Sequence, residues 1–137
     1  MASQLNPYLT FDGNAREAME FYHAIFGGEL KVNTFGEFGA PDPAIADKVM
    51  HAMLTTDRGY VLMASDTAPG MGTFTPGDTM TVSLSGDPGE GLEDVWEKLA
   101  DGATVTLPFE KQMWGDLYGQ LVDKYGVPWM VNVGATQ

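Results

Sequence analysis

Two side chains of this 137-residue chain have the chemistry of a proton-transfer site. His51 lies in the strand-like run VMHAMLT, and an imidazole gains and loses a proton near neutral pH. Asp66 ends the apolar run YVLMASD, where a partly desolvated carboxylate could act as a general base. Each residue also has a structural interpretation, because an aspartate at a strand end commonly caps a turn. The catalytic residues stay unassigned, with His51 and Asp66 as the candidates.

The sequence offers few ligands for a metal ion. Zinc, iron and manganese sites need three or four His, Cys, Asp or Glu side chains. The chain has no cysteine and two histidines, and His23 shares a helix face with the charged Arg16 and Glu20. We therefore expect no metal site. No glycine-rich phosphate loop opens a predicted helix, so we also expect no cofactor of the nucleotide type.

Methionine and aromatic side chains indicate a binding cavity. Nine methionines are many for this length, and several lie in or beside predicted strands, near Trp114, Tyr118 and Trp129. Adaptable core filling is the simpler explanation. Together with aromatic rings and few charges, however, the same residues suit a pocket for a small, partly apolar molecule.

The charge of the chain excludes several kinds of partner. Nineteen acidic and seven basic residues leave a formal charge of −12, which disfavours nucleic acid and anionic membrane surfaces. No apolar run approaches the roughly 20 residues of a membrane span, and no basic region followed by an apolar stretch marks a secretion signal. We expect a cytoplasmic protein.

Two segments have the spacing of amphipathic helices. In the first, Asn14 and Glu17 form a predicted capping box, and Gly27 follows as a left-handed stop. In the second, Asp87 is the predicted N-cap and Pro88 fits the first helical position. The apolar stripes consist of Ala15, Ala18, Met19, Tyr22, Ile25 and Phe26 in the first helix and Leu92, Val95, Trp96 and Leu99 in the second.

The same order of elements occurs twice. Residues 5–66 and 79–134 each predict a strand, a helix and three strands, and Met19 and Tyr22 correspond to Leu92 and Val95 at an offset of about 73. Such a repeat predicts two βαβββ modules that cover each other's open faces. We therefore expect an α+β fold, in which one domain over residues 1–137 forms a cupped mixed sheet with a cavity where the modules meet. Segments 39–48, 67–78 and the stretch around 112–116 are predicted loops.

Four stretches of the sequence resemble a known family. They are NPYLTFDGNAREAMEFYHAIFGGEL, VMHAMLT, VLMASDTAPG and WGDLYGQLVDKYGVPWMVNV. They are similar to the PhnB-like branch of the vicinal oxygen chelate superfamily, which includes glyoxalase I, fosfomycin- and bleomycin-resistance proteins and extradiol dioxygenases. The resemblance covers nearly the whole chain. It implies the glyoxalase-like fold of paired βαβββ modules, usually assembled as a homodimer.

The resemblance also implies where metal ligands would lie. In the metal-using members they come from the first and last strands of each half, which correspond here to Pro7, Thr81, Ser65 or Asp66, and Met130. Proline and methionine do not bind a hard divalent cation, and threonine is a poor ligand. The metal site of the superfamily is therefore expected to be lost. PhnB-like proteins are also labelled ubiquinone-pathway methyltransferases, but this chain has no loop for a methyl-donor cofactor.

Two functions of different classes are compatible with these residues. The first is a binding protein that holds a small, partly apolar molecule without a metal ion or cofactor. The second is a lyase, isomerase or epimerase that uses His51 and Asp66, either metal-free or with metal ligands recruited from Asp66, His51 and Glu110. The predicted ligand-binding residues are Leu9, Phe11, His51, Met63, Asp66, Thr81, Trp114, Tyr118 and Met130.

Overall fold

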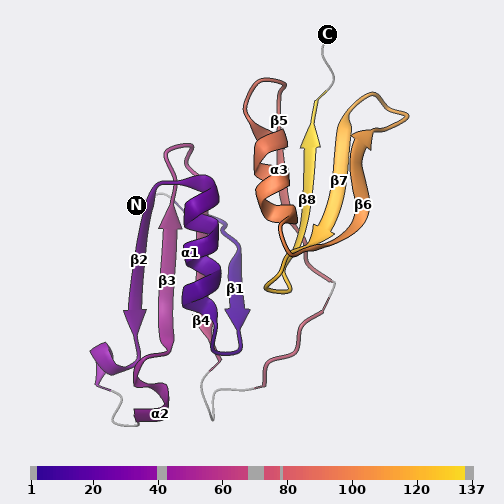
Figure 1. Ribbon diagram of the computed structural model, residues 1–137. Coiled ribbons are helices and arrows are strands. Elements are labelled where there is room, and N and C mark those ends of the chain that lie inside the picture. The colour runs from indigo at the N-terminus through magenta and orange to yellow at the C-terminus, as the bar shows by residue number, and fades with distance from the viewer. Residues whose placement is uncertain (1–2, 40–42, 68–72, 78, 135–137) are drawn as a thin grey trace. The chain divides into compact units, whose positions relative to one another are not determined.

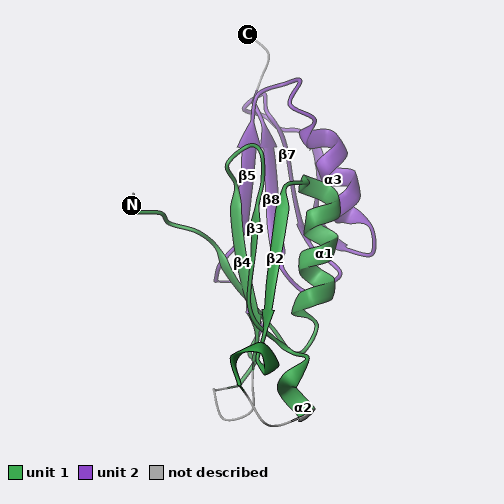
Figure 2. Ribbon diagram, turned by 90° about the vertical axis from the view of Figure 1, so that its left-hand side faces the viewer, with its two compact units in different colours: residues 1–75 green, residues 76–137 purple. Residues whose placement is uncertain are grey.

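Each half of the chain contains a strand, a helix and three further strands in that order, and the first half has two additional short helices between its second and third strands (Figure 1). The computed structural model describes residues 3–39, 43–67, 73–77 and 79–134. The chain divides into two units, Met1–Thr75 and Pro76–Gln137 (Figure 2). No helix in the described part of the chain is long and apolar enough to cross a membrane.

Unit 1 contains a four-stranded sheet, here called sheet A, with strand order β1-β4-β3-β2. Strands β1 and β4 are parallel, and the other neighbours are antiparallel. The predicted loop 39–48 contains the short helix α2, and its residues 40–42 lie outside the described residues. The elements are β1 (Tyr8–Phe11), α1 (Ala15–Phe26), β2 (Glu29–Thr34), η1 (Gly36–Phe38), α2 (Pro43–Ala46), β3 (Val49–Thr55) and β4 (Val61–Asp66).

Unit 2 repeats this topology in sheet B, with strand order β5-β8-β7-β6 and one parallel pair, β5 and β8. Residues 68–72 and 78 of the predicted loop 67–78 lie outside the described residues. The predicted α+β fold of two βαβββ modules is confirmed. The elements are β5 (Val82–Gly86), α3 (Leu92–Ala100), β6 (Thr104–Lys111), β7 (Leu117–Val122) and β8 (Pro128–Val133).

The second helix begins later than predicted. Asp87 does not cap it; its N–H donates to the Glu90 carboxylate at 2.5 Å within a turn. Gly89 and Gly91 have φ values of 91° and 81°, which lie outside the right-handed helical region, so α3 starts only at Leu92. The start of α1 at the fully buried Ala15 therefore corresponds to the start of α3 at Leu92. The offset between the two helices is thus about one helical turn longer than the predicted offset of about 73.

Each helix packs its apolar stripe on one face of its own sheet (Figure 2). In unit 1, Met19 and Tyr22 of α1 are fully buried. In unit 2, the indole of Trp96 stacks on the ring of Phe109, with ring centroids 5.2 Å apart. Gly119 of β7 makes this approach possible, since a Cβ there would lie 2.8 Å from Trp96.

Candidate functional site

Each sheet has one face covered by its own helix and one face that this helix leaves uncovered (Figures 1 and 2). Side chains alternate between the two faces along a strand. In sheet A, the fully buried Ala52, Leu54 and Ala64 point toward α1, so His51 and Met63 point to the opposite face. We call the face opposite the helix the helix-free face of each sheet.

A row of polar side chains crosses the helix-free face of sheet A. Thr10 of β1 pairs with Ser65 of β4, and His51 of β3 pairs with Asn33 of β2. His51 precedes Ala52 and Ser65 follows Ala64, and Ala52 and Ala64 are the last pair of β3 and β4. His51 and Ser65 therefore lie side by side on these two strands. Every strand of the sheet thus contributes a hydroxyl, an imidazole or an amide. We call Thr10, Ser65, His51 and Asn33 polar row A.

His51 has an aromatic partner that sequence reasoning missed. The phenol oxygen of Tyr8 lies 3.2 Å from His51 Nδ1, and the ring centroids are 5.8 Å apart. Tyr8 pairs with Met63 across β1 and β4, so phenol, imidazole and thioether share the helix-free face. A phenol beside an imidazole can orient a ligand oxygen or take part in proton transfer.

Sheet B carries an equivalent row. Ser85 of β5 pairs with Asn132 of β8, Asn132 pairs with Tyr118 of β7, and Tyr118 pairs with Glu110 of β6. We call these four residues polar row B. In both sheets the row lies one residue before the last pair of the two parallel strands. The internal repeat has therefore placed hydrogen-bonding side chains at the same level in both units.

Apolar and aromatic side chains lie next to these rows. Met63 and Met130 occupy the next level of β4 and β8 on the helix-free faces. The phenol of Tyr118 donates to Met130 Sδ at 3.7 Å and accepts from Gln120 Nε2 at 2.6 Å. The ring of Trp114 meets that of Tyr118 edge-on, with centroids 5.8 Å apart. Five predicted ligand-binding residues thus lie in or beside the polar rows, namely His51 and Met63 in unit 1 and Trp114, Tyr118 and Met130 in unit 2.

Asp66 has a structural role on the face of sheet A that α1 covers. Its side chain is buried, and Oδ1 accepts hydrogen bonds from the backbone N–H groups of Gly13 at 3.0 Å and Ala15 at 2.9 Å. Oδ2 accepts from the N–H of Val49 at 2.8 Å. Asn14 makes no side-chain cap hydrogen bond. The predicted capping box is therefore wrong, because the carboxylate of Asp66 satisfies the first turn of α1 instead.

The position of Asp66 corrects two further predictions. Asp66 pairs with Phe11, and Leu9 pairs with the buried Ala64, so Leu9 and Phe11 also point toward α1. The predicted cavity-facing pattern along β1 was one residue out of phase, and such a shift turns every side chain to the other face. His51 and Asp66 lie on opposite faces of sheet A. They therefore do not form an acid–base pair or share a metal ion.

The side chains at the positions of the superfamily's metal ligands do not fit a divalent cation. The carbonyl of Pro7 accepts a hydrogen bond from the N–H of Met63 at 3.1 Å. Of the other positions, Ser65 presents a hydroxyl and Met130 a thioether on the helix-free face of its sheet, and Thr81 lies before β5 begins. No group of three or more His, Cys, Asp or Glu that could hold a metal occurs among the residues that the structure describes.

The helix N-termini do not fit an anionic cofactor either. Two backbone N–H groups at the start of α1 are already bound by the Asp66 carboxylate. The first turn of α3 carries Glu93 and Asp94, whose negative charges repel a phosphate or carboxylate. Methyl-donor or nucleotide chemistry therefore receives no support from these elements.

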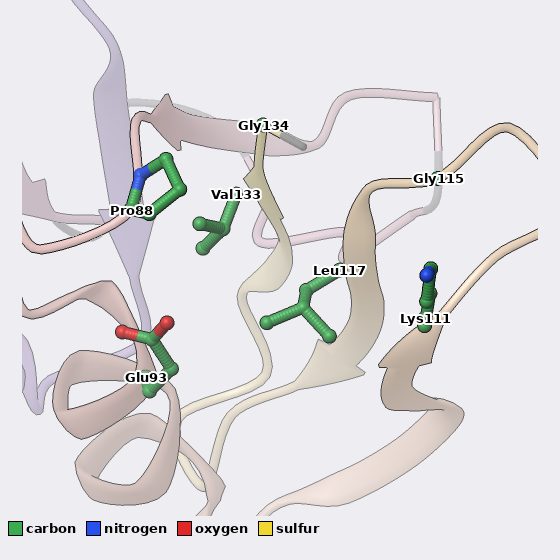
Figure 3. A pocket seen from close by; sticks show the side chains of 7 residues that line it. All are labelled: Pro88, Glu93, Lys111, Gly115, Leu117, Val133 and Gly134. Carbon is green, nitrogen blue, oxygen red and sulfur yellow. The ribbon is translucent and has the colours of Figure 1, made fainter. Parts of the chain in front are cut away.

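A hollow of about 430 Å³ lies in unit 2, beside α3 on the helix side of sheet B (Figure 3). Figure 3 shows Glu93 at one side, Val133 and Leu117 in the middle and Lys111 at the other side. The two charged side chains are exposed and long, so they do not provide a preorganised contact. The hollow is also separate from polar row B, which lies on the opposite face.

Comparison with known proteins identifies the family. The family model described as 3-demethylubiquinone-9 3-methyltransferase matches residues 3–132, so the chain belongs to this family. Protein YjdN of Escherichia coli K12 is 31% identical over 145 residues, which cover 94% of each chain. The PhnB-like assignment made from the sequence is confirmed.

Solved structures agree with the family and the fold. Protein PA1353 of Pseudomonas aeruginosa is 35% identical with a TM-score of 0.87, covering 98% of this chain and 100% of that chain. A PhnB protein from Bacillus cereus is 27% identical with a TM-score of 0.75, covering 96% and 100%. A glyoxylase/bleomycin resistance protein/dioxygenase domain from Frankia sp. EAN1pec is 18% identical with a TM-score of 0.64, covering 98% and 93%. This last likeness extends to the fold alone.

Proposed function

We propose that this protein binds a small, partly apolar molecule on the helix-free faces of its sheets, without a metal ion. The observation that carries this proposal is the pair of polar rows, which cross all four strands of each sheet at equivalent levels. Groups on strands are held rigidly and can orient a ligand, while Met63, Met130 and the rings of Trp114 and Tyr118 suit its apolar part.

Residues of both rows join the binding set expected from the sequence. His51, Met63, Tyr118 and Met130 stay in it, together with Trp114 beside Tyr118. Thr81, next to β5, also stays a predicted contact. Leu9, Phe11 and Asp66 leave it because they point toward α1. We add to it the other side chains of the two rows and their neighbours, which are Tyr8, Thr10, Asn33, Ser65, Ser85, Glu110, Gln120 and Asn132.

The direct test is to identify a bound molecule and the residues that hold it. Native mass spectrometry of protein purified without a chelating tag reports a co-purified compound. A fragment screen by amide chemical shifts should then move signals along the two rows. Asn132→Ala should weaken such a ligand several-fold, whereas Asn14→Ala should not, since Asn14 lies at the start of α1. Shifts confined to the helix sides would overturn the proposal.

The second candidate function is a metal-free lyase, isomerase or epimerase that uses His51. The 3.2 Å contact between Tyr8 and His51 favours it, and Tyr8 takes the place that the sequence prediction gave to Asp66. Once a ligand is known, Tyr8→Phe and His51→Ala separate the two candidates. Lost turnover with retained affinity supports the enzyme, whereas equal loss of affinity in both variants supports binding alone.

A further inference from the structure

Two aromatic rings form a corner beside polar row B. Tyr118 is held by hydrogen bonds to Gln120 and Met130, and Trp114 meets it edge-on at an interplanar angle of 61°. The face of an aromatic ring carries negative potential, and indole and phenol faces attract cations most strongly when water is displaced. Hydrogen bonds fix the phenol of Tyr118, whereas Trp114 is 58% exposed, so Tyr118 is the fixed ring of the corner and the indole of Trp114 is accessible to a ligand.

Carboxylates flank this corner. Glu110 is the direct cross-strand partner of Tyr118, so its side chain projects on the same face. Asp116 accepts a hydrogen bond from Asn132 Nδ2 at 3.0 Å, which holds it beside the same row. Gln112 Nε2 bridges the carbonyl oxygens of Glu110 and Tyr118 at 3.0 and 3.2 Å, and this fixes the two strands where the rings lie.

The lysines of unit 2 lie away from this corner. Lys98 pairs with Asp94 on α3 at 3.1 Å, and Lys124 lies 5.6 Å from the ring centroid of Tyr125. Lys111 pairs with Leu117 and lines the hollow on the helix side. Over residues 76–137, ten acidic residues stand against three basic ones. Unit 2 therefore has an excess of negative formal charge, and two of its carboxylates, Glu110 and Asp116, lie beside the corner.

We propose that polar row B and the Trp114–Tyr118 corner select a ligand that carries a positive charge, specifically a substituted ammonium group. This inference rests on the proposed binding function and adds the charge of the ligand. The ammonium group packs against the two rings, and its charge is balanced by Glu110 and Asp116. The hydroxyl of Ser85 and the amide oxygens of Asn132 and Gln120, whose amide nitrogens hold Asp116 and Tyr118, bind the polar remainder of the molecule.

Three probes of one shape and different charge test the proposal. They are choline, its uncharged isostere 3,3-dimethylbutan-1-ol, and the anion 3,3-dimethylbutanoate. We expect choline to bind roughly tenfold more tightly than the alcohol in titrations followed by amide chemical shifts, and the anion to bind most weakly. Raising the salt concentration should weaken choline binding and leave the alcohol unaffected.

Matched variants assign the effect to the corner. Trp114→Ala should weaken choline binding roughly tenfold, and Trp114→Phe should retain part of it, because phenylalanine keeps a π-face. Glu110→Gln should weaken choline but not the alcohol. Glu97→Gln removes an exposed carboxylate from α3 and serves as the control for net charge. Thermal unfolding of each variant shows that it is folded.

The outcomes separate this inference from the proposed function. If the alcohol or the anion binds as tightly as choline, the ligand is not selected by positive charge, and the inference fails while small-molecule binding stands. If Glu97→Gln weakens choline as much as Glu110→Gln, only the net charge matters and the assigned corner is wrong. If choline does not bind at all, the inference is also overturned, and a co-purified neutral compound would still support the binding function.

Discussion

Two buried aspartates show how one residue type can hold a fold without taking part in chemistry. Asp66 accepts three backbone hydrogen bonds in unit 1. Asp123 in unit 2 accepts hydrogen bonds from the N–H groups of Tyr125 and Val127 and from the indole of Trp129, at 2.8, 3.1 and 2.9 Å. A buried carboxylate needs such partners to offset its desolvation. Burial with full pairing thus distinguishes these two from the carboxylates proposed to bind ligand.

Replacing Asp66 with asparagine tests its structural role. The amide oxygen of Asp66→Asn can still accept from Gly13 and Ala15, but its NH₂ group faces the N–H of Val49, so one bond is lost and a donor is left unpaired. We expect the free energy of unfolding to fall by about 2–3 kcal/mol in urea titrations. The exposed Asp47→Asn should change it by less than about 0.5 kcal/mol. Equal effects of the two variants would contradict the capping role.

The side chains at the positions of the superfamily's metal ligands give a second prediction at the scale of single residues. Pro7, Ser65 and Met130 do not form a site for a hard cation, so zinc, nickel and manganese should leave the melting temperature unchanged within about 1 °C. Metal analysis of protein made without a chelating tag should find far less than one ion per chain. A stoichiometric ion, or a rise of several degrees, would show that ligands have been recruited elsewhere.

At the scale of elements, the contact of α3 with sheet B depends on one missing side chain. A Cβ at Gly119 would lie 2.8 Å from both the Trp96 ring and the Cα of Phe109. One of these neighbours is backbone, so rotation of a side chain cannot relieve the overlap. Gly119 therefore sets how closely the helix approaches the sheet, and with it the stacking of Trp96 on Phe109.

Gly119→Ala should lower the free energy of unfolding by roughly 1–3 kcal/mol, because overpacking forces the helix or β6 to move. Gly77→Ala is the matched control, since a Cβ there meets nothing within 4 Å. Chemical denaturation followed by tryptophan fluorescence measures both. If Gly119→Ala proves as stable as the control, α3 can shift at little cost and the close approach is not required.

At the scale of the whole molecule, the edge strands of the two sheets predict self-association. Sheet A ends in β1 and β2, and sheet B ends in β5 and β6. Unpaired edge N–H and C=O groups favour pairing with another chain, and symmetric dimers are the commonest solution. We expect light scattering at micromolar concentration to report twice the chain mass of 14.8 kDa. A single species of one chain mass would reject the homodimer.

Local periodicity in the sequence determined the elements and their order. Helical stripes such as that containing Ala15, Met19 and Tyr22, and the repeat of βαβββ modules, can be read from spacings of a few residues, because they reflect the geometry of single helices and strands. Family membership could be predicted for the same reason, since long stretches of the chain keep the family's pattern. The expected cavity where the modules meet, and the single domain, stay predictions.

Strand register could be decided only by the tertiary structure. The run YLTF already held a signal, since its apolar Leu9 and Phe11 alternate with Tyr8 and Thr10, but alternation alone does not say which face the helix covers. Polar rows A and B arise from pairings between residues up to 55 positions apart, such as Thr10 with Ser65. Side-chain direction in a sheet reverses with each residue, so the site depends on non-local pairing that no short pattern specifies.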